Sequence, residues 1–329
     1  MLQVAIIGLG LIGTSLGMAL RNADEKSAPL GETVIVGYDR NPKVVSDARG
    51  RLAIDRGVRT IDEAVSGAKL VVVAVPALAV REVFAAIAPR LDHGAVVTDV
   101  TSTKAQVLAW ARELLPASAA FVGGHPMAGR ERSGPAAADP QLFDGAIYCL
   151  TPDAQTRPEA VELVEAMVHQ VGAKPYYIDP VEHDHYVAGV SHLPFVLSTL
   201  LVELTQRSPG WKEMAPLAAT GYRDISRLAS GDPAMHRDIC LTNAAALTRW
   251  IDGLTAALSE LRADLAAGDT DALMERFERA RDQREAWLAS RPGVRPGEDD
   301  FANISQAALE RPSLFGRMFG TRGPQERKR

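Results

Sequence analysis

Short apolar runs and amphipathic segments alternate along the first half of the chain. The apolar runs lie between residues 2 and 178 and are LQVAII, VIVGYD, LVVVAV, AVVTDV, AFVGG, AIYCL and PYYI. Nearly continuous apolar runs separated by helical patterns are typical of parallel strands that are covered on both faces. The pattern therefore predicts an α/β fold with a doubly wound sheet, in which the later strands are open to antiparallel pairing.

The pattern changes after residue 179. From there to about residue 290 no strand pattern occurs, and periodicities such as HYVAGVSHLPFVLSTLLVEL and RWIDGLTAALSELRADL predict long helices. Residues 291–329 are rich in proline, glycine and charge. We therefore expect a sheet domain over residues 1–179, an all-helical C-terminal domain over 180–290 and a loosely ordered tail over 291–329.

The expected helical domain is apolar around much of its circumference. Segments such as LPFVLSTLLVEL leave too little polar surface for a free-standing bundle. A second copy of the chain would cover such a surface. We therefore expect a homodimer that forms through this domain.

A glycine pattern follows the first expected strand directly. It reads Gly8, Leu9, Gly10, Leu11, Ile12, Gly13 and opens a helical segment. In a G-x-G-x-x-G turn the first glycine permits the tight turn, the second lets a pyrophosphate approach the backbone, and the third lets helix and strand pack closely. The helix N-terminus adds free N–H donors. The context predicts a Rossmann-like dinucleotide site, although a glycine turn that binds nothing is the alternative.

An acidic residue ends the second expected strand. Asp39 lies 26 residues after Gly13, where a carboxylate can accept hydrogen bonds from both ribose hydroxyls of an adenosine. The polar insertion NADEKSAPLGE lengthens the usual spacing. Asp39 would repel a 2′-phosphate, so we predict NAD rather than NADP, while the neighbouring Arg40 is the residue type that accommodates that phosphate.

Candidate chemistry follows two further expected strands. Ser102 lies in the turn TSTK after AVVTDV, and His125 lies in the run VGGHPMAG. Glycines beside His125 permit close approach of a ligand, and a neutral imidazole can accept a proton from a hydroxyl. We therefore predict His125 as a base, with a structural histidine as the alternative. Thr101 or Ser102 has a second interpretation, the cap of a helix that begins near Lys104.

The helical domain holds two more candidates. His192 lies just before Pro194, which removes a backbone donor and predicts a kink beside a pocket. A packed core histidine is the other interpretation. Arg227 can bind a carboxylate through two parallel N–H bonds, whereas an ion pair with Asp224 on the surface is the alternative.

These motifs together resemble a known family. GLGLIGTSL, DVTSTK, GGHPMAGRERSG, SHLP and GYRDISRLASGDPAMHRDI are similar, in order and spacing, to the prephenate and arogenate dehydrogenases of tyrosine biosynthesis, over residues 1 to about 285. The resemblance implies that Ser102 and His125 lie at the ring hydroxyl of the substrate, that His192 lines the pocket, that Arg227 holds a carboxylate and that Glu131 lies at the pocket mouth. His236 departs from the family, which often has a tryptophan there.

The resemblance implies a reaction and leaves rivals. The reaction is the NAD-dependent oxidative decarboxylation of prephenate to 4-hydroxyphenylpyruvate, with conversion of arogenate to tyrosine as the alternative. Dehydrogenases of the β-hydroxyacid type share the layout, but they usually have a catalytic lysine in the long helix after the sheet, and this chain has no lysine between Lys174 and Lys212. A non-enzymatic dinucleotide-binding module gives no reason for His125 and Arg227.

Charge bears on the choice of substrate. Prephenate ends in a keto acid, whereas arogenate carries an ammonium group. Glu131 can pair with that ammonium, but Arg130 and Arg132 flank it and His236 stands nearby in the family pattern. Three groups that are or can become cationic favour the more anionic substrate, prephenate, by about 1 kcal/mol.

Composition limits the other function classes. The net charge is −5, from 36 basic and 41 acidic residues, so bulk electrostatics do not favour nucleic acid as a partner. Cys149 and Cys240 show no CxxC or Cys/His spacing, and buried, reduced thiols are expected. The cluster of Glu182, His183 and His185 is the nearest metal candidate, but we interpret it as the solvated start of a helix and expect no metal.

The N-terminal sequence and the longest apolar stretches bear on the compartment. Residues 1–13 have no basic segment of the kind that begins a secretory signal. We also expect no apolar stretch to reach the roughly 18 residues that a membrane span needs. A cytoplasmic protein without a membrane partner is therefore predicted.

Overall fold

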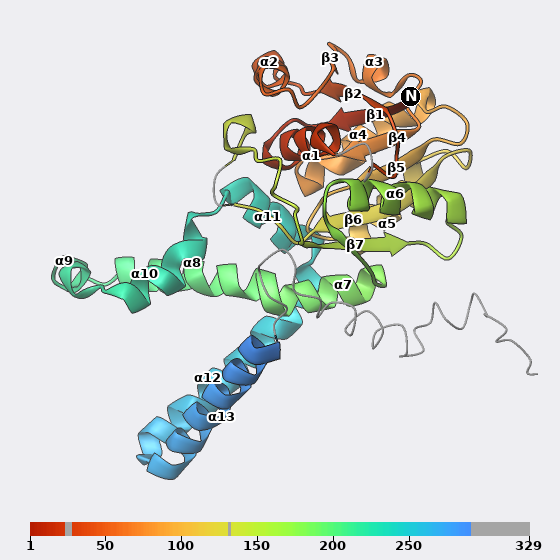
Figure 1. Cartoon of the computed structure of the whole chain (residues 1–329). Coiled ribbons are helices and arrows are strands. Elements are labelled where there is room, and N and C mark those ends of the chain that lie inside the picture. Colours follow the sequence, from red (N-terminus) through yellow and green to blue (C-terminus); the bar gives the residue numbers. More distant parts are fainter. Residues whose placement is uncertain (24–27, 131–132, 291–329) are drawn as a thin grey trace, which may run out of the picture. The chain divides into compact units, whose positions relative to one another are not determined.

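The computed structural model describes residues 1–23, 28–130 and 133–290 (Figure 1). The described chain divides into two compact units, one formed by residues 1–152 and 156–259, the other by residues 153–155 and 260–290. The predicted tail over 291–329 and Glu131 lie outside the described residues. The domain boundaries at 179 and 290 stay a prediction.

One mostly parallel sheet organises the larger unit. Its strands lie in the order β3-β2-β1-β4-β5-β6-β7-β8, and only the pairing of β6 with β7 is antiparallel. The predicted doubly wound sheet is confirmed, and all seven predicted strands are present. The bounds are β1 Leu2–Ile7, β2 Thr33–Tyr38, β3 Arg56–Gly57, β4 Leu70–Val73, β5 Val96–Asp99, β6 Ala120–Pro126, β7 Ile147–Pro152 and β8 Lys174–Tyr177. The two-residue strand β3 was not predicted because it is too short to show a pattern.

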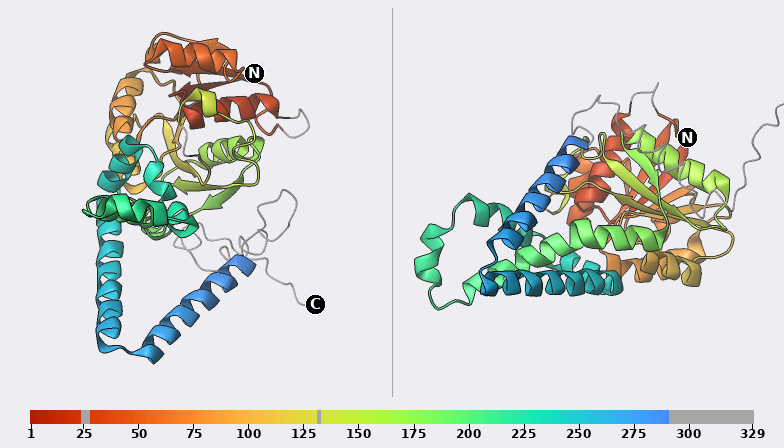
Figure 2. Two further views of the ribbon diagram at one scale, coloured as in Figure 1. Left: turned by 90° about the vertical axis from the view of Figure 1, so that its left-hand side faces the viewer. Right: turned by 90° about the horizontal axis from the view of Figure 1, so that it is seen from below.

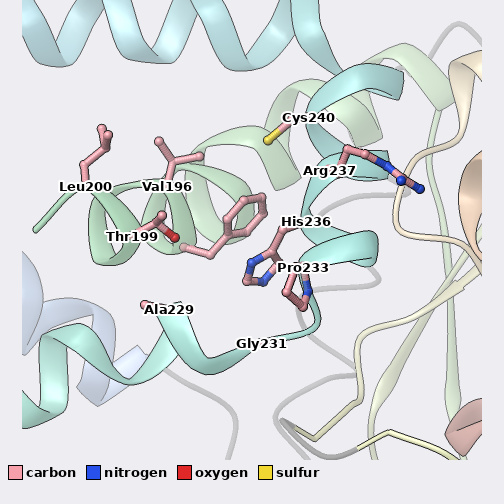
Figure 3. A pocket seen from close by; sticks show the side chains of 10 residues that line it. Val196, Thr199, Leu200, Ala229, Gly231, Pro233, His236, Arg237 and Cys240 are labelled. Atoms are coloured by element: carbon pink, nitrogen blue, oxygen red, sulfur yellow. The ribbon is translucent and has the colours of Figure 1, made fainter. Parts of the chain in front are cut away.

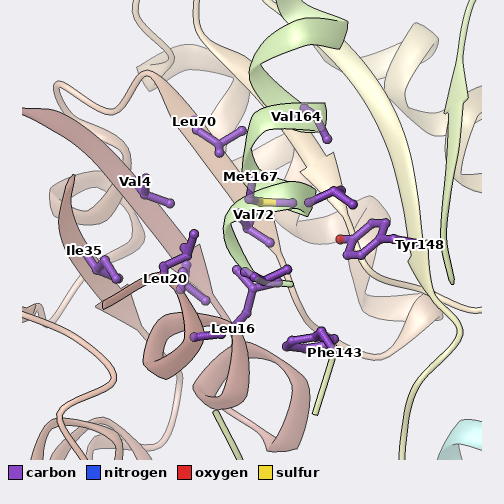
Figure 4. Packing of buried hydrophobic residues seen from close by; sticks show 14 of the residues in the cluster. Val4, Leu16, Leu20, Ile35, Leu70, Val72, Phe143, Tyr148, Val164 and Met167 are labelled. Carbon is purple, nitrogen blue, oxygen red and sulfur yellow. The ribbon is translucent and has the colours of Figure 1, made fainter. Parts of the chain in front are cut away.

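Helices cover both faces of this sheet, and each face has its own apolar core. One core includes α1 (Leu11–Asn22) and α6 (Pro158–Gln170), and its packing around Leu16, Tyr148 and Met167 is shown in Figure 4. The other includes residues of the short helix α3 (Ile61–Val65), α4 (Val80–Ile87) and α5 (Ala105–Leu114). Helix α2 spans Pro42–Gly50. Two buried faces explain why the strands are apolar at nearly every position.

Helices dominate the described chain after β8. They are α7 Pro180–Val187, the π-helix η5 Ala188–His192, α8 Leu193–Gln206, α9 Trp211–Met214, α10 Thr220–Ser226, α11 Pro233–Thr242, α12 Ala244–Ala267 and α13 Thr270–Ser290, with a 3-10 turn η7 at Arg227–Ser230. The predicted all-helical region is confirmed over residues 180–290. Segments α7, η5 and α8 follow one another as a continuous helical rod (Figure 2). The π-turn lies just before Pro194, where the sequence predicted a kink, and it widens the helix without ending it.

One expectation about apolar stretches is wrong. The rod Pro180–Gln206 is 27 residues long, and its best window has a mean hydropathy of 1.6, so it passes the length and composition test for a membrane span. Polar residues interrupt the apolar run, but the mean hydropathy over the 18-residue window stays high. His192 and Ser198 on this rod are buried and hydrogen-bonded within the protein, and such a helix also occurs in folds that do not span a membrane.

The two cysteines differ from each other. Cys149 is buried in β7, as expected, and burial raises the pKa of its thiol to about 11. Cys240 on α11 is only half-buried, so the expectation of a buried thiol is wrong for this residue. Both are free thiols.

The smaller unit carries exposed apolar side chains. In its described part, Arg276 on α13 pairs with Glu260 and Asp264. Leu265, Phe277 and Trp287 each expose more than half of their surface, at 61%, 62% and 56%. Apolar side chains this exposed are typical of an interface.

Candidate active site

The glycine turn after β1 has the geometry that its sequence predicts. Gly8 has φ +95°, a conformation that side chains disfavour, and a Cβ there would lie 2.4 Å from the Ala74 carbonyl oxygen. A Cβ on Gly13 would lie 2.0 Å from the carbonyl oxygen of Gly8. Around Gly10, in contrast, nothing lies within 4 Å of the Cβ position. The second glycine therefore leaves open space in front of α1, where a side chain would intrude on a bound pyrophosphate.

Asp39 is tied to the same turn. Its Oδ2 accepts from the Leu9 N–H at 3.0 Å, and its Oδ1 accepts from the Asn41 N–H at 2.9 Å. Gly10, at the N-cap of α1, has no side chain to cap the helix, so N–H donors of the first turn are left for a ligand. Arg40 is exposed beside Asp39. Leu11 and Ile12, the first residues of α1, are half-buried. These residues fit a dinucleotide with its pyrophosphate at α1 and its ribose at Asp39.

A buried ion pair joins the ends of β5 and β6. Lys104 contacts Asp99 through Nζ, and both side chains are fully buried. The ammonium also donates to the Gly124 carbonyl oxygen at 2.6 Å, and Asp99 Oδ1 accepts from the Gly124 N–H at 3.2 Å. We call the Lys104–Asp99 pair and its bonds to Gly124 the clamp. It holds the turn that contains Ser102 next to the end of β6, which carries His125. Sequence reasoning treated Lys104 only as a helix start and missed this pair.

The turn after β5 does not cap the following helix with its hydroxyls. Thr101 Oγ1 contacts Asp99 and donates to the Thr103 carbonyl oxygen at 3.0 Å. The N-terminus of α5 is instead covered by Asp184, which accepts from the N–H groups of Lys104 at 2.7 Å and Ala105 at 2.9 Å. The interpretation of Thr101 as a helix cap is therefore wrong. Ser102 is half-buried at the carboxyl end of the sheet.

His125 lies in a row of buried polar side chains. It is 8% exposed, and its Nδ1 lies 2.9 Å from Nε2 of His183. His183 is 1% exposed, and its Nδ1 lies 2.8 Å from Oδ1 of Asp184. The expectation that His183 lies on a solvated helix face is wrong, because α7 turns this side towards the sheet. Glu182 and His185 on the same helix do remain partly or fully exposed.

His192 is connected to the same network. It is fully buried in η5, and its Nδ1 lies 3.2 Å from Nδ2 of Asn243, which also donates to the Asp184 carbonyl oxygen at 2.7 Å. An amide N–H donates, so Nδ1 of His192 accepts and its Nε2 carries the proton. Among the described residues that Nε2 has no partner. His192 thus offers one buried donor to a ligand.

An apolar pocket lies beside these residues, between α8 and α11 (Figure 3). Its volume is about 360 Å³, and Val196, Leu200, Ala229, Gly231, His236 and Cys240 are among its lining residues. His236 stacks on Phe195 with ring centroids 4.1 Å apart, and Phe195 in turn lies 6.1 Å from the His192 ring. Burial lowers the pKa of His236. His236, at the position where the family often has tryptophan, therefore lines the pocket with a mostly neutral aromatic ring.

The remaining predicted residues lie on the surface. Arg227 is exposed and begins η7. Asp224 pairs with Arg223 at 3.4 Å, so the surface ion pair predicted for this carboxylate involves a different arginine. Arg130 pairs with Asp139. No cluster of three or more histidine, cysteine or acidic side chains in the described ranges is arranged to hold a metal ion.

Burial sets the protonation of the two site histidines. It lowers the pKa of His125 well below the usual value, and the neighbouring His183, Lys104 and His192 lower it further. Burial also lowers the pKa of His192 to about 4. Both rings are therefore neutral at neutral pH, which leaves His125 able to accept a proton.

This shift predicts the pH dependence of activity and stability. Because the neutral form of His125 persists below about pH 6.5, kcat/KM should stay flat from pH 8 down to that value and fall only in more acidic solution. In the unfolded chain His125 and His192 take up protons below about pH 6.5, whereas in the folded chain both stay neutral there, so the free energy of unfolding should fall from that pH towards pH 4. A pH profile with an acidic limb centred above about 7 would contradict this assignment.

Comparison with known proteins agrees with this geometry. Residues 26–177 match the family described as "Prephenate dehydrogenase, nucleotide-binding domain", and residues 179–279 match "Prephenate dehydrogenase, dimerization domain". The chain is 34% identical to prephenate dehydrogenase of Bacillus subtilis, over 89% of this chain and 78% of the relative. The chain belongs to the prephenate dehydrogenase family. The family and the fold class predicted from the motifs are thereby confirmed.

Two further relatives of this family are informative. Cyclohexadienyl dehydrogenase of Zymomonas mobilis is 33% identical, over 89% of this chain and 98% of the relative. The crystal structure of prephenate dehydrogenase from A. aeolicus in complex with hydroxyphenyl propionate and NAD+ superimposes with a TM-score of 0.79 at 29% identity, and the match covers 87% of this chain and 98% of that one. The match thus extends across both the nucleotide-binding and the dimerization domains of the family.

Proposed function

We propose that this chain is an NAD-dependent prephenate dehydrogenase, which converts prephenate to 4-hydroxyphenylpyruvate and CO2. The observation that carries the proposal is the juxtaposition of His125, a buried neutral imidazole, with the carboxyl ends of the parallel strands, the edge of the sheet that also carries the glycine turn. Family membership and the NAD+ bound to the A. aeolicus relative support the same cofactor.

The chemistry requires few groups. NAD, when bound, would accept the hydride that leaves C4 of the substrate ring. His125 accepts the proton of the C4 hydroxyl through Nε2 as the hydride leaves C4, so the carbinol becomes a carbonyl, and Ser102 orients that hydroxyl. Loss of the C1 carboxylate as CO2 sends its electron pair into the ring, and the C4 oxygen recovers the proton from His125. Aromatisation makes the sequence effectively irreversible.

His192 and Arg227 supply substrate contacts in this proposal. The buried Nε2–H of His192 is a donor for a substrate oxygen. Arg227 binds a substrate carboxylate through its planar fork. Glu131 stays a prediction for the pocket mouth because it lies outside the described residues.

Arg227 gives a prediction that separates binding from chemistry. Arg227→Ala should raise KM for prephenate by about tenfold or more, because a charge-assisted bidentate contact is lost, while kcat falls less. Arg227→Lys should recover little, since lysine lacks the planar fork. Arg223→Ala, which removes a neighbouring exposed arginine, is the matched control and should leave KM unchanged. An unchanged KM in Arg227→Ala would remove this residue from the site.

The structure supports the preference for prephenate over arogenate with fewer cationic groups than the sequence indicated. Arg130 is already paired with Asp139, and burial lowers the pKa of His236, so neither supplies a free positive charge. The preference is instead supported by relatives that are named prephenate dehydrogenase. The cyclohexadienyl dehydrogenase relative keeps arogenate as the second candidate substrate.

Other function classes fit less well. A dinucleotide-binding module without enzymatic activity leaves the buried row from His125 to Asp184 without a role. A dehydrogenase of the β-hydroxyacid type would need a lysine in the helical rod, and Pro180–Gln206 contains none. The proposed function includes a cytoplasmic location and a homodimer, which the dimerization-domain match and the exposed apolar residues of α12 and α13 support.

A paired assay tests the proposal. The purified chain is given prephenate or arogenate, each with NAD or NADP, and formation of the reduced cofactor is followed. We expect the highest kcat/KM with prephenate and NAD, because Asp39 disfavours a 2′-phosphate. A kcat/KM about tenfold higher with arogenate or with NADP would overturn the corresponding half of the assignment.

A further inference from the structure

The row from His125 to Asp184 has a defined hydrogen-bond direction. Asp184 accepts backbone N–H groups on both carboxylate oxygens, from Lys104 at 2.7 Å and from Ala105 at 2.9 Å. A carboxylate in this setting only accepts, so His183 donates to it through Nδ1–H. A neutral His183 then has an unprotonated Nε2, which accepts from Nδ1–H of His125.

The direction of these bonds determines which nitrogen of His125 can act as a base. With its proton on Nδ1, a neutral His125 has an unprotonated Nε2. The opposite direction would place the proton on Nε2 and leave no acceptor for a substrate hydroxyl. We propose that His183 and Asp184 are positioning residues that fix His125 in the tautomer whose Nε2 accepts the substrate proton. This inference rests on the proposed function and adds two residues that no sequence motif indicated.

The fold holds both residues in place. They are consecutive on α7, are 1% and 4% exposed, and face the sheet. The backbone donors at the start of α5 orient Asp184, and the edge-to-face contact of the two imidazoles, with an interplanar angle of 74°, orients His183. When His125 takes the substrate proton, its Nδ1–H bond to His183 strengthens because the donor is then charged. The row thus keeps Nδ1–H of His125 hydrogen-bonded while Nε2 holds the substrate proton.

Two substitutions at one position test the role of His183. His183→Phe keeps a ring against His125 but removes the acceptor, so kcat should fall by about 10²-fold while KM for prephenate and NAD stays close to the wild-type value. His183→Gln carries a side-chain oxygen that reaches the position of the lost nitrogen, so it should recover about tenfold of that loss. A purely structural role would give no such rescue.

The matched control lies two residues further along the same helix. The His185 ring stacks on Trp250, and among the described residues it makes no hydrogen bond to His125, His183 or Asp184, so His185→Phe should keep wild-type kcat. Nitrogen NMR of labelled histidine in the ligand-free wild type reads the tautomer directly and needs no variant. We expect His125 to be protonated at Nδ1 and unprotonated at Nε2 at neutral pH.

Three outcomes would overturn the inference. They are a protonated Nε2 on His125 in the wild type, a His183→Phe variant within about threefold of wild-type kcat, and equal losses for Phe and Gln at position 183. Failure of the proposed function can be distinguished from failure of this inference, because the wild-type enzyme would then not turn over prephenate. The NMR measurement tests the tautomer in either case.

Discussion

His125→Asn should lower kcat for prephenate by about 10²- to 10⁴-fold, the usual contribution of a general base. Asparagine preserves a hydrogen-bonding side chain at the end of β6, but it does not accept a proton at neutral pH. Because His125 lies apart from the glycine turn in sequence and has no role in binding the adenosine, the Kd for NAD should be unchanged. The loss should therefore lie in kcat, with KM little affected.

The control for this experiment is an exposed histidine. His93→Asn removes an imidazole outside the site and should keep wild-type kinetics. Thermal unfolding of both variants shows whether the fold is intact. If His125→Asn retains more than about a third of wild-type kcat, His125 is not the base.

Lys104→Met should destabilise the fold by about 3–5 kcal/mol, because it leaves the Asp99 carboxylate buried without its ammonium partner. Burial lowers the pKa of Lys104, and the charge of Asp99 and its hydrogen bond to the ammonium oppose that shift. Activity should fall as well, since the clamp fixes the strand end that carries His125.

A second substitution separates the lost pair from lost packing. Asp99→Asn combined with Lys104→Met removes both charges, so the double variant should be more stable than Lys104→Met alone. Lys69→Met, at an exposed lysine, is the matched control and should change the free energy of unfolding by less than about 0.5 kcal/mol. Chemical denaturation measures all three. A Lys104→Met variant as stable as the Lys69→Met control would contradict the clamp.

The parts of the site that sequence predicts well are local. Gly8, Gly10 and Gly13 lie together in one turn, and their spacing alone carries the steric requirement that the structure shows. Asp39 follows because the end of β2 lies next to the end of β1 in any doubly wound sheet. The pairing of β1 with β2 is enough to bring these residues together, so the rest of the fold need not be known to predict them.

The parts that sequence reasoning missed depend on long-range packing. His183 meets His125 across 58 positions, and Asp184 meets the start of α5 across 80. In the segment PVEHDHYV, apolar and charged residues alternate too irregularly to show which side of α7 is buried. The length of lysine similarly favours an exposed position, whereas Lys104 is buried because Asp99 and a carbonyl oxygen satisfy its ammonium. A carboxylate next to a histidine at a helix start is the only local signal.

Product analysis with prephenate and NAD measures the proposed reaction itself. The purified wild-type chain is mixed with both, and NADH, CO2 and the aromatic product are quantified in the same sample. We expect one NADH and one CO2 for each 4-hydroxyphenylpyruvate formed, and at most about 1% of that yield from His125→Asn over the same time. Absence of NADH formation from prephenate by folded wild-type protein, or an undiminished yield from His125→Asn, would contradict it.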